Sequence, residues 1–171
     1  MDIERTHSFD APLARVLATL ASADYARHLA ASHSFFAAIE PLSVERTEHA
    51  VRRVVRYRAR PFLRRLGPFS VPASWFVWIE RSELDLASGR LTFDNVPELP
   101  SVRDKVVNRG TMLFRAREGE QPRGAETVRT ARFEIDFDVA PMMRPLAEMA
   151  LSMVARTLTA SLDEEARLLA G

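Results

Sequence analysis

The amino-acid sequence predicts an α+β fold in which a curved, antiparallel, seven-stranded sheet wraps around one long C-terminal helix. Residues 141 to 171 form a long helical pattern that carries four of the six methionines. About 90 residues of alternating strand precede this helix. Two short helical segments follow the first strand, so helices and strands are segregated along the chain as in α+β proteins.

The size and composition of the chain indicate an ordinary globular protein. It has 171 residues, of which 47% are hydrophobic and 27% are charged. A chain of this length buries roughly two thirds of its unfolded surface and forms a core without disulfides or metals. We therefore expect one domain that spans residues 1–171.

The absence of cysteine excludes disulfides, thiolate zinc sites and cysteine nucleophiles. The N-terminus is charged from its second residue, and no apolar run reaches the roughly 18 residues that cross a bilayer. We expect a cytoplasmic protein without a transmembrane segment. No motif predicts a cofactor.

The basic residues are almost all arginine. Lys105 is the only lysine among 24 basic residues, and the net charge is +1. We interpret this bias as the codon preference of a GC-rich bacterial genome. Nucleic-acid binding proteins more often combine net positive charge with interleaved aromatic residues on one face, so we expect no nucleic-acid partner.

The N-terminal third predicts one strand and two short helices. In residues 2 to 9, Ile3, Arg5, His7 and Phe9 share one face of a strand. Asp10 or Ala11 then caps a helix that begins at Pro12 and ends at about Ala21. Ser22 caps a second helix that ends at about Ala31.

From Ile39 the pattern predicts six antiparallel strands with short polar connections. The first hairpin covers Ile39 to Arg60 and turns near Thr47-Glu48-His49. After the connection Pro61 to Pro72, strands follow over Ala73 to about Leu86 and over Arg90 to Val96. A second connection, Pro97 to about Val107, leads to two strands with clear alternation around Met112 and Phe133.

The final helix begins at Pro141 and has two apolar stripes. One consists of Met142, Leu146, Met149 and Met153, and the other of Leu151, Val154, Leu158 and Leu162. Methionine suits adaptable ligand surfaces and also fills irregular cores, so the first stripe predicts either a cavity lining or core packing.

The order of these elements resembles the helix-grip fold of the START and pollen-allergen superfamily, also called SRPBCC, over essentially the whole chain. The segment Phe9-Asp10-Ala11-Pro12, followed by Val16, Leu17 and Leu20, is similar to the superfamily's common start. Val139-Ala140-Pro141 before the long helix is similar to an uncharacterised bacterial branch.

The resemblance implies a large cavity between the concave sheet and the long helix, which holds lipids, sterols, polyketides or other hydrophobic molecules. Some members are aromatase/cyclases, and others are partners of chaperones. The resemblance also implies that the connections Pro61 to Pro72 and Pro97 to Val107 border the mouth of the cavity.

We expect the inward faces of the strands and the methionine stripe to supply the ligand contacts. The candidates are Tyr57, Trp75, Phe93, Met112, Phe114, Phe133, Ile135, Met149 and Met153. Each of them is also consistent with core packing. The orientation of Trp75 stays open, because Phe76 and Trp78 make the opposite face nearly as apolar.

Three polar residues, His7, Arg53 and Arg129, fall on inward strand faces. An unpaired buried polar group costs on the order of 1 to 3 kcal/mol, so such residues need partners. One hypothesis is that they anchor the acidic or polar end of an apolar ligand, because arginine matches a carboxylate with two donors. The alternative is that each reaches solvent or a structural acid near a strand end.

No linear motif identifies a reaction. The chain lacks G-x-S-x-G and G-x-x-x-x-G-K motifs, and His28 and His33 are not spaced to bind a metal from one helix face. A cyclase or dehydratase needs no linear motif, and His7 with Tyr57 is the candidate acid/base pair.

The connection Pro61 to Pro72 combines apolar residues with Arg64 and Arg65. It is a candidate lid, or a peripheral contact with an anionic membrane or an acidic protein. The leading hypothesis is a protein that binds a hydrophobic small molecule or lipid in an internal cavity. The alternatives are a polyketide-type cyclase or dehydratase, and a non-enzymatic interaction module with a filled core.

Overall fold

The computed structural model describes residues 1–61, 64–66, 68–117, 127–141 and 144–170. Seven strands form one antiparallel sheet in the order β1-β9-β8-β7-β6-β3-β2. They are β1 (Asp2–Phe9), β2 (Phe36–Arg46), β3 (Ala50–Ala59), β6 (Val77–Asp85), β7 (Arg90–Pro97), β8 (Val106–Ala116) and β9 (Thr127–Phe137). The predicted seven-stranded antiparallel sheet is confirmed.

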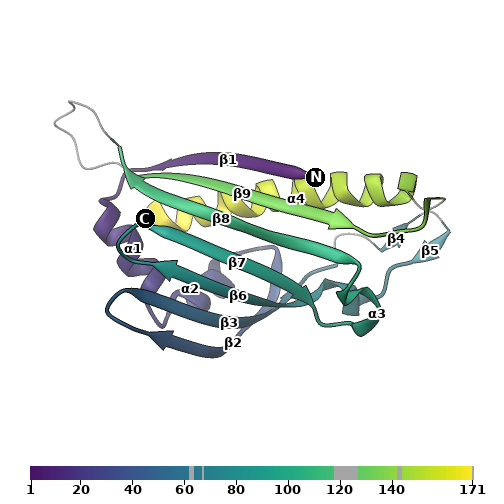
Figure 1. Ribbon diagram of the computed structural model, residues 1–171, viewed down its shortest axis with the longest axis horizontal. Coiled ribbons are helices and arrows are strands. Elements are labelled where there is room, and N and C mark those ends of the chain that lie inside the picture. The colour runs from purple at the N-terminus through teal and green to yellow at the C-terminus, as the bar shows by residue number, and fades with distance from the viewer. Residues whose placement is uncertain (62–63, 67, 118–126, 142–143, 171) are drawn as a thin grey trace.

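The remaining elements surround this sheet. They are the helices α1 (Leu13–Ala21), α2 (Tyr25–Ser32), α3 (Pro100–Arg103) and α4 (Arg144–Ala170), the 3-10 helix η1 (Ala73–Phe76), and the two-residue strands β4 (Arg65–Leu66) and β5 (Phe69–Ser70). Helix α4 lies along one face of the curved sheet, with α1 and α2 at one end and β4, β5 and α3 at the other (Figure 1). The predicted packing of the sheet on a long C-terminal helix is confirmed.

The alternation of the sequence sets which side chains face α4. In β3, Val51, Arg53, Val55 and Tyr57 are buried, as the pattern predicts. The hairpin between β2 and β3 turns at residues 47 to 49, where the Thr47 hydroxyl oxygen accepts a 3.0 Å hydrogen bond from the Ala50 amide. The predicted turn is therefore confirmed, because a short polar side chain satisfies the turn backbone.

Several predicted boundaries are wrong, among them the start of the second helix, which begins at Tyr25 with Asp24 as its N-cap rather than after Ser22. The strand expected from Ala73 begins only at Val77, because Pro72 opens a 3-10 turn in which the Trp75 amide donates to the Pro72 carbonyl at 3.1 Å. The long helix begins at Arg144 rather than at Pro141. Met142, which we placed in the methionine stripe, lies outside the described residues.

Gly110 in β8 permits a close approach on the inner face of the sheet. A Cβ atom at this position would lie 2.7 Å from the Phe93 ring and 2.2 Å from the Arg132 carbonyl oxygen. The missing side chain lets Phe93 reach Phe133, whose ring centroid is 5.0 Å away. These two rings form part of the inner wall of the sheet.

The side of α4 that faces the sheet is not the one that carries the methionine stripe. The stripe containing Leu151, Val154, Leu158 and Leu162 packs on the core. Met149 is the neighbour of the buried Ala150, so its side chain points about 100° away from that of Ala150 around the helix axis. It is 44% exposed. None of the described helices is both long and apolar enough to cross a membrane.

Candidate functional site

A cavity of about 610 Å³ lies between the inner face of the sheet and α4. Helix α4 contributes mainly small and aliphatic residues to its wall, among them Ala147, Ala150 and Val154. Rings from β3, β6, β7 and β9 form much of the opposite wall. Near the N-terminal end of α4, the side chains that the structure describes along the cavity, Ala147 and Ala150, are small and leave this space unfilled.

One end of the cavity lies at the connections that we expected to border its mouth. Val71 from the first connection and Ser101, Val102 and Lys105 from the second line the cavity. Trp75 lines it as well and is 47% exposed, which places this ring at the rim. Phe62 and Leu63, on which a membrane contact would depend, lie outside the described residues.

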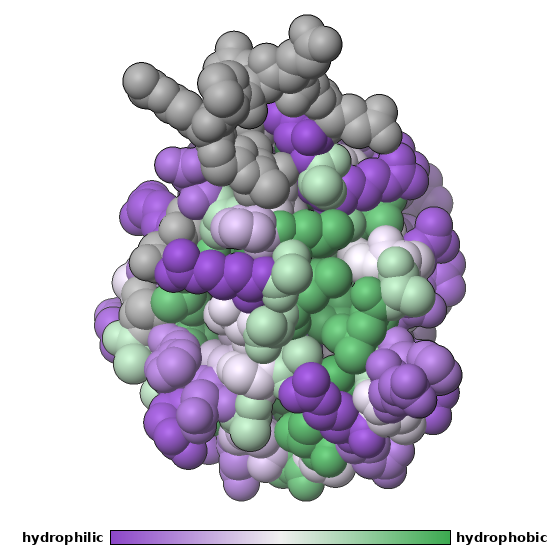
Figure 2. All heavy atoms as spheres, turned by 90° about the vertical axis from the view of Figure 1, so that its left-hand side faces the viewer, coloured by the Kyte–Doolittle hydropathy of each residue, from purple (hydrophilic) through white to green (hydrophobic). Residues whose placement is uncertain are grey.

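The other end is bounded by α2 and the C-terminal half of α4, where Tyr25, Ser161 and Glu165 line the wall. This is the end of the molecule at which α1 and α2 lie. Figure 2 shows it as a closely packed surface on which apolar and charged residues intermingle.

The structure brings together seven of the twelve expected ligand contacts. Along the cavity wall lie Arg53, Tyr57, Trp75, Phe93, Met112, Phe133 and Ile135. Tyr57 stacks on Trp78, with ring centroids 5.5 Å apart and planes 13° from parallel. Burial raises the pKa of the Tyr57 hydroxyl well above its usual value, so this group stays protonated at neutral pH.

Phe114, Met149 and Met153 are not among the residues that line the cavity. Phe114 is buried in the core, where its ring stacks on Phe9 at 6.5 Å. The two methionines lie on a side of α4 adjacent to the one that faces the cavity, as the phase of the helix dictates. The expectation that these three residues line the cavity is wrong.

His7 and Arg129 also lie outside the cavity lining, because both are committed to partners on α4. Arg129 is fully buried and donates hydrogen bonds to Glu165 Oε2 at 2.5 Å and to the Leu162 carbonyl at 2.9 Å. Tyr25 donates its hydroxyl hydrogen to the other oxygen of Glu165. The alternative of a structural acid therefore holds for Arg129.

The hydrogen bonds of His7 define its tautomer. Arg129 Nη2 lies 3.2 Å from His7 Nδ1, and an arginine nitrogen only donates, so Nδ1 accepts. Nε2 therefore carries the hydrogen and donates to Asp163 Oδ1 at 2.8 Å. Both ring nitrogens are occupied, and His7 does not form the expected acid/base pair with Tyr57.

Arg53 differs from Arg129 in having no ion-pair partner among the described residues. Its side chain lines the cavity and is 9% exposed, and its guanidinium carbon lies 5.3 Å from the centroid of the Tyr25 ring. Its Nε atom is buried without a hydrogen-bond partner, as is that of Arg129, so the missing ion pair is what distinguishes the two residues. Arg53 therefore brings to the cavity a positive charge that has no ion-pair partner among the described residues, although Glu80 is near enough to interact with it electrostatically.

Glu80 on β6 is a polar residue that the sequence analysis missed. It is half-buried and lines the cavity. Burial raises the pKa of its carboxyl group from 4.5 to about 7, while Arg53 and the Ser82 hydroxyl act in the opposite direction. Near neutral pH, Glu80 is thus divided between its acid and its carboxylate forms.

Asn95 on β7 and Asn108 on β8 also line the cavity and were missed. The Oδ1 atoms of both amides are buried without a hydrogen-bond partner. Strand alternation could have found them, because Asn95 lies two residues after Phe93 and Asn108 lies four residues before Met112. Among the described residues, no group of histidine, aspartate and glutamate side chains could hold a metal ion.

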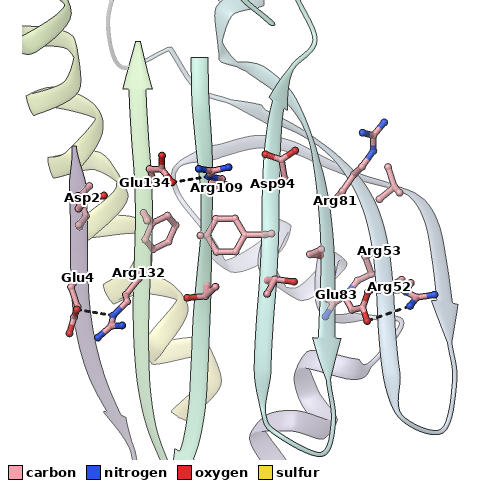
Figure 3. Close-up of a pocket in the computed structure, with 18 of the residues that line it drawn as sticks. Asp2, Glu4, Arg52, Arg53, Arg81, Glu83, Asp94, Arg109, Arg132 and Glu134 are labelled. Carbon is pink, nitrogen blue, oxygen red and sulfur yellow. Dashed lines mark hydrogen bonds and ion pairs between the residues drawn. The ribbon is translucent and has the colours of Figure 1, made fainter. Parts of the chain in front are cut away.

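The outer face of the sheet carries charges in pairs (Figure 3). Arg132 contacts Glu4 at 2.9 Å, Arg109 contacts Glu134 at 2.8 Å, and Arg52 contacts Glu83 at 2.9 Å. These side chains border a broad, open depression of about 1060 Å³. Much of the arginine-rich face is therefore made of exposed ion pairs, as expected for a solvated surface.

Comparison with known proteins supports the fold assignment. No protein-family model and no curated protein sequence matches the chain. Protein TTHA0849 from Thermus thermophilus has a similar structure, with a TM-score of 0.67, 16% identity, and coverage of 99% of this chain and 97% of that one.

Two enzymes also share the fold. The ZhuI aromatase/cyclase from Streptomyces sp. R1128 gives a TM-score of 0.61 at 18% identity, covering 99% of this chain and 93% of that chain. Norcoclaurine synthase from Thalictrum flavum, in complex with dopamine and hydroxybenzaldehyde, gives 0.66 at 12% identity, covering 99% and 86%. The chain therefore has the helix-grip fold.

The two inward arginines should respond differently to the same substitution. Arg129→Met should lower the free energy of unfolding by about 3 to 5 kcal/mol, because it leaves Glu165 half-buried without its cation. Arg53→Met removes no ion pair and should cost about 1 kcal/mol or less. Urea denaturation at neutral pH measures the free energy of unfolding of both variants. Equal losses would contradict the conclusion that Arg129 forms a stabilising ion pair and Arg53 does not.

The raised pKa of Glu80 predicts a pH-dependent stability. The folded state holds the Glu80 proton more tightly than the unfolded chain, so the stabilisation is complete below about pH 4.5 and is lost as the pH rises to about 7. Relative to Glu80→Gln, the wild-type protein should lose about 3 kcal/mol over this interval. Glu83→Gln, on the outer face, is the matched control, and a wild-type pH dependence equal to that of Glu80→Gln would refute the assignment.

Proposed function

We propose that this protein binds a hydrophobic small molecule or lipid in the cavity between its sheet and α4, as a single domain. The observation that carries the proposal is an internal space of about 610 Å³ with mainly apolar and aromatic walls. Small-molecule sites are usually concave, mostly apolar and of roughly 300 to 1,000 Å³, with a few polar groups that fix the orientation of the ligand. This cavity has each of these properties.

Arg53 supplies the polar recognition. A ligand carboxylate at Arg53 would compensate a buried charge that has no ion-pair partner among the described residues, and it would accept a hydrogen bond from the orphaned Nε. The apolar part of the ligand would extend along Tyr57, Phe93, Met112, Phe133 and Ile135, toward Trp75 at the rim. The ligand is accordingly an amphiphile with one acidic end.

The related structures are consistent with such a role. The norcoclaurine synthase structure contains dopamine and hydroxybenzaldehyde, so a fold of this kind accommodates small aromatic molecules. Fold alone does not determine function, and the proposal depends on the cavity of this chain.

Calorimetric titration with decanoate and decanol tests the proposal. The wild-type protein should bind both, and decanoate about tenfold more tightly, because only the carboxylate pairs with Arg53. Arg53→Met should abolish this preference, whereas Arg81→Met, on the outer face of the neighbouring strand, should retain it. Ala147→Phe should weaken the binding of both ligands by filling the cavity.

The possible results separate the parts of the proposal. If neither ligand binds and native mass spectrometry of the purified protein shows no bound small molecule, cavity binding is wrong. If both bind but Arg53→Met keeps the preference for decanoate, the cavity function stands and the role of Arg53 is wrong.

A dehydratase or cyclase is the second candidate function, and the state of Glu80 favours it. A carboxyl group with a pKa of about 7 can both accept and donate a proton at neutral pH, which suits general acid–base catalysis. In a dehydration, Glu80 would take a proton from the carbon next to a ligand carbonyl. The hydroxyl group on the following carbon would leave as water after receiving this proton back from Glu80, which regenerates the carboxylate.

Loss of water from an aryl β-hydroxyketone, followed through the absorbance of the enone product, tests this candidate. The wild-type rate should exceed that of buffer, and kcat/KM should change with an apparent pKa near 7. Glu80→Gln should reduce the rate at least a hundredfold while ligand binding persists, and Glu83→Gln should not. A wild-type rate equal to that of buffer would count against the dehydratase.

A further inference from the structure

We infer that the inner wall of the cavity selects a flat, ring-based ligand with two hydroxyl groups in a meta relation, and that Asn95 and Asn108 accept hydrogen bonds from them. This inference rests on the proposed binding function and specifies the ligand class. It follows from a row of polar side chains that crosses three adjacent strands, Glu80, Asn95 and Asn108, which we call the polar row.

The register of the sheet places the polar row on three adjacent strands. Glu80 on β6 is paired with Asn95 on β7. The last pair between β7 and β8 is Asp94 with Arg109, and Asn95 and Asn108 are the next residue on each of these two strands. Because directly opposed residues point to the same side of a sheet, the three side chains share one face, and all three line the cavity.

The two amides lack partners inside the protein. The Oδ1 atoms of Asn95 and Asn108 are buried without a hydrogen bond, and Asn95 is only 9% exposed. Leaving such an acceptor unsatisfied is unfavourable, so the wall favours a ligand that brings donors to it. Hydroxyl groups satisfy this condition, whereas an alkyl chain does not.

Aromatic side chains flank the polar row on both sides. On one side, Phe93 packs against Phe133 at 5.0 Å between ring centroids. On the other, Tyr57 stacks on Trp78 at 5.5 Å. Phe93 lies two residues before Asn95, and Trp78 lies two residues before Glu80, so aromatic surface borders these two polar positions. This arrangement suits a flat ring with polar substituents directed at the sheet.

The separation between the amides sets the substitution pattern. Paired strands lie about 4.8 Å apart, and Asn95 and Asn108 stand one residue beyond the last pair of β7 with β8, so we infer a separation of about that size between their acceptors. Meta-related hydroxyl oxygens on a six-membered ring are separated by a similar distance, whereas hydroxyls on adjacent ring carbons are much closer together. Glu80 continues the row by one strand and offers a place for a third polar substituent.

Titration with three ligands of equal tail length tests the inference. Hexylresorcinol carries meta hydroxyls, hexylcatechol carries adjacent hydroxyls, and hexylbenzene carries none. In the wild-type protein, calorimetry should show hexylresorcinol binding about tenfold more tightly than hexylcatechol. Asn95→Leu and Asn108→Leu should each reduce this preference to less than about threefold and should leave the affinity for hexylbenzene the same or higher.

Ile135→Val is the matched control, because Ile135 lies opposite Asn108 in the register and has no hydrogen-bonding group. This variant should change the affinities for all three ligands by the same factor. The leucine variants replace unsatisfied amides by apolar groups of similar shape, so they should fold, and their thermal unfolding verifies this.

The results distinguish this inference from the function on which it rests. Equal wild-type affinities for hexylresorcinol and hexylcatechol overturn the inference, and hexylbenzene binding that Ala147→Phe abolishes then leaves the cavity function intact. A preference for hexylresorcinol that survives both leucine variants also overturns it, since the amides would not be its source. If none of the three ligands binds, the inference fails, and the titration with decanoate and decanol decides separately whether the cavity function stands.

Discussion

The buried ion pair between Arg129 and Glu165 fixes the position of α4 on the sheet. Arg129 projects from β9 and bonds to both a side chain and a main-chain carbonyl of α4. Tyr25 attaches α2 to the same carboxylate. One carboxylate thus connects the sheet and two helices at the closed end of the cavity. An ion pair of this kind is costly to break because the remaining charge stays buried.

The ion pair holds the C-terminal half of α4 against the sheet. The N-terminal half of α4 therefore does not have to pack closely on the sheet to keep the helix in place. The residues that α4 turns toward the sheet near that end, Ala147 and Ala150, are small. The sheet supplies rings on the opposite side, but they pack against one another, as the Tyr57 and Trp78 pair shows, rather than across the gap. The cavity therefore lies beneath a part of α4 whose described side chains toward the sheet are small, in a helix that the ion pair keeps in position.

Much of this architecture follows from local pattern. Alternation identified the inward faces of β3 and β9 because each strand has one buried face, and a wrong register would expose Val51 or Ile135. The methionine stripe was misplaced because two adjacent apolar stripes on one helix are equivalent by periodicity, and only the packed sheet decides between them. The partners of Arg129 and His7 could not be found, since Glu165 and Asp163 are distant in sequence and no periodicity connects them.

Arg53 and Arg129 show why residue type and strand parity do not reveal a binding site. Both are arginines on inward strand faces, yet Arg129 meets a carboxylate from α4, whereas Arg53 packs on the face of Tyr25 and has no ion-pair partner among the described residues. Among the described residues, three of the five unsatisfied buried side-chain groups, at Arg53, Asn95 and Asn108, lie on the cavity wall, and the other two are the Nε atoms of Arg56 and Arg129. Each lowers the stability of the empty protein, and a protein tolerates such groups most readily where their partner arrives with a ligand. A ligand that satisfies them would gain affinity from the same interactions whose absence destabilises the empty fold, which links ligand occupancy directly to stability.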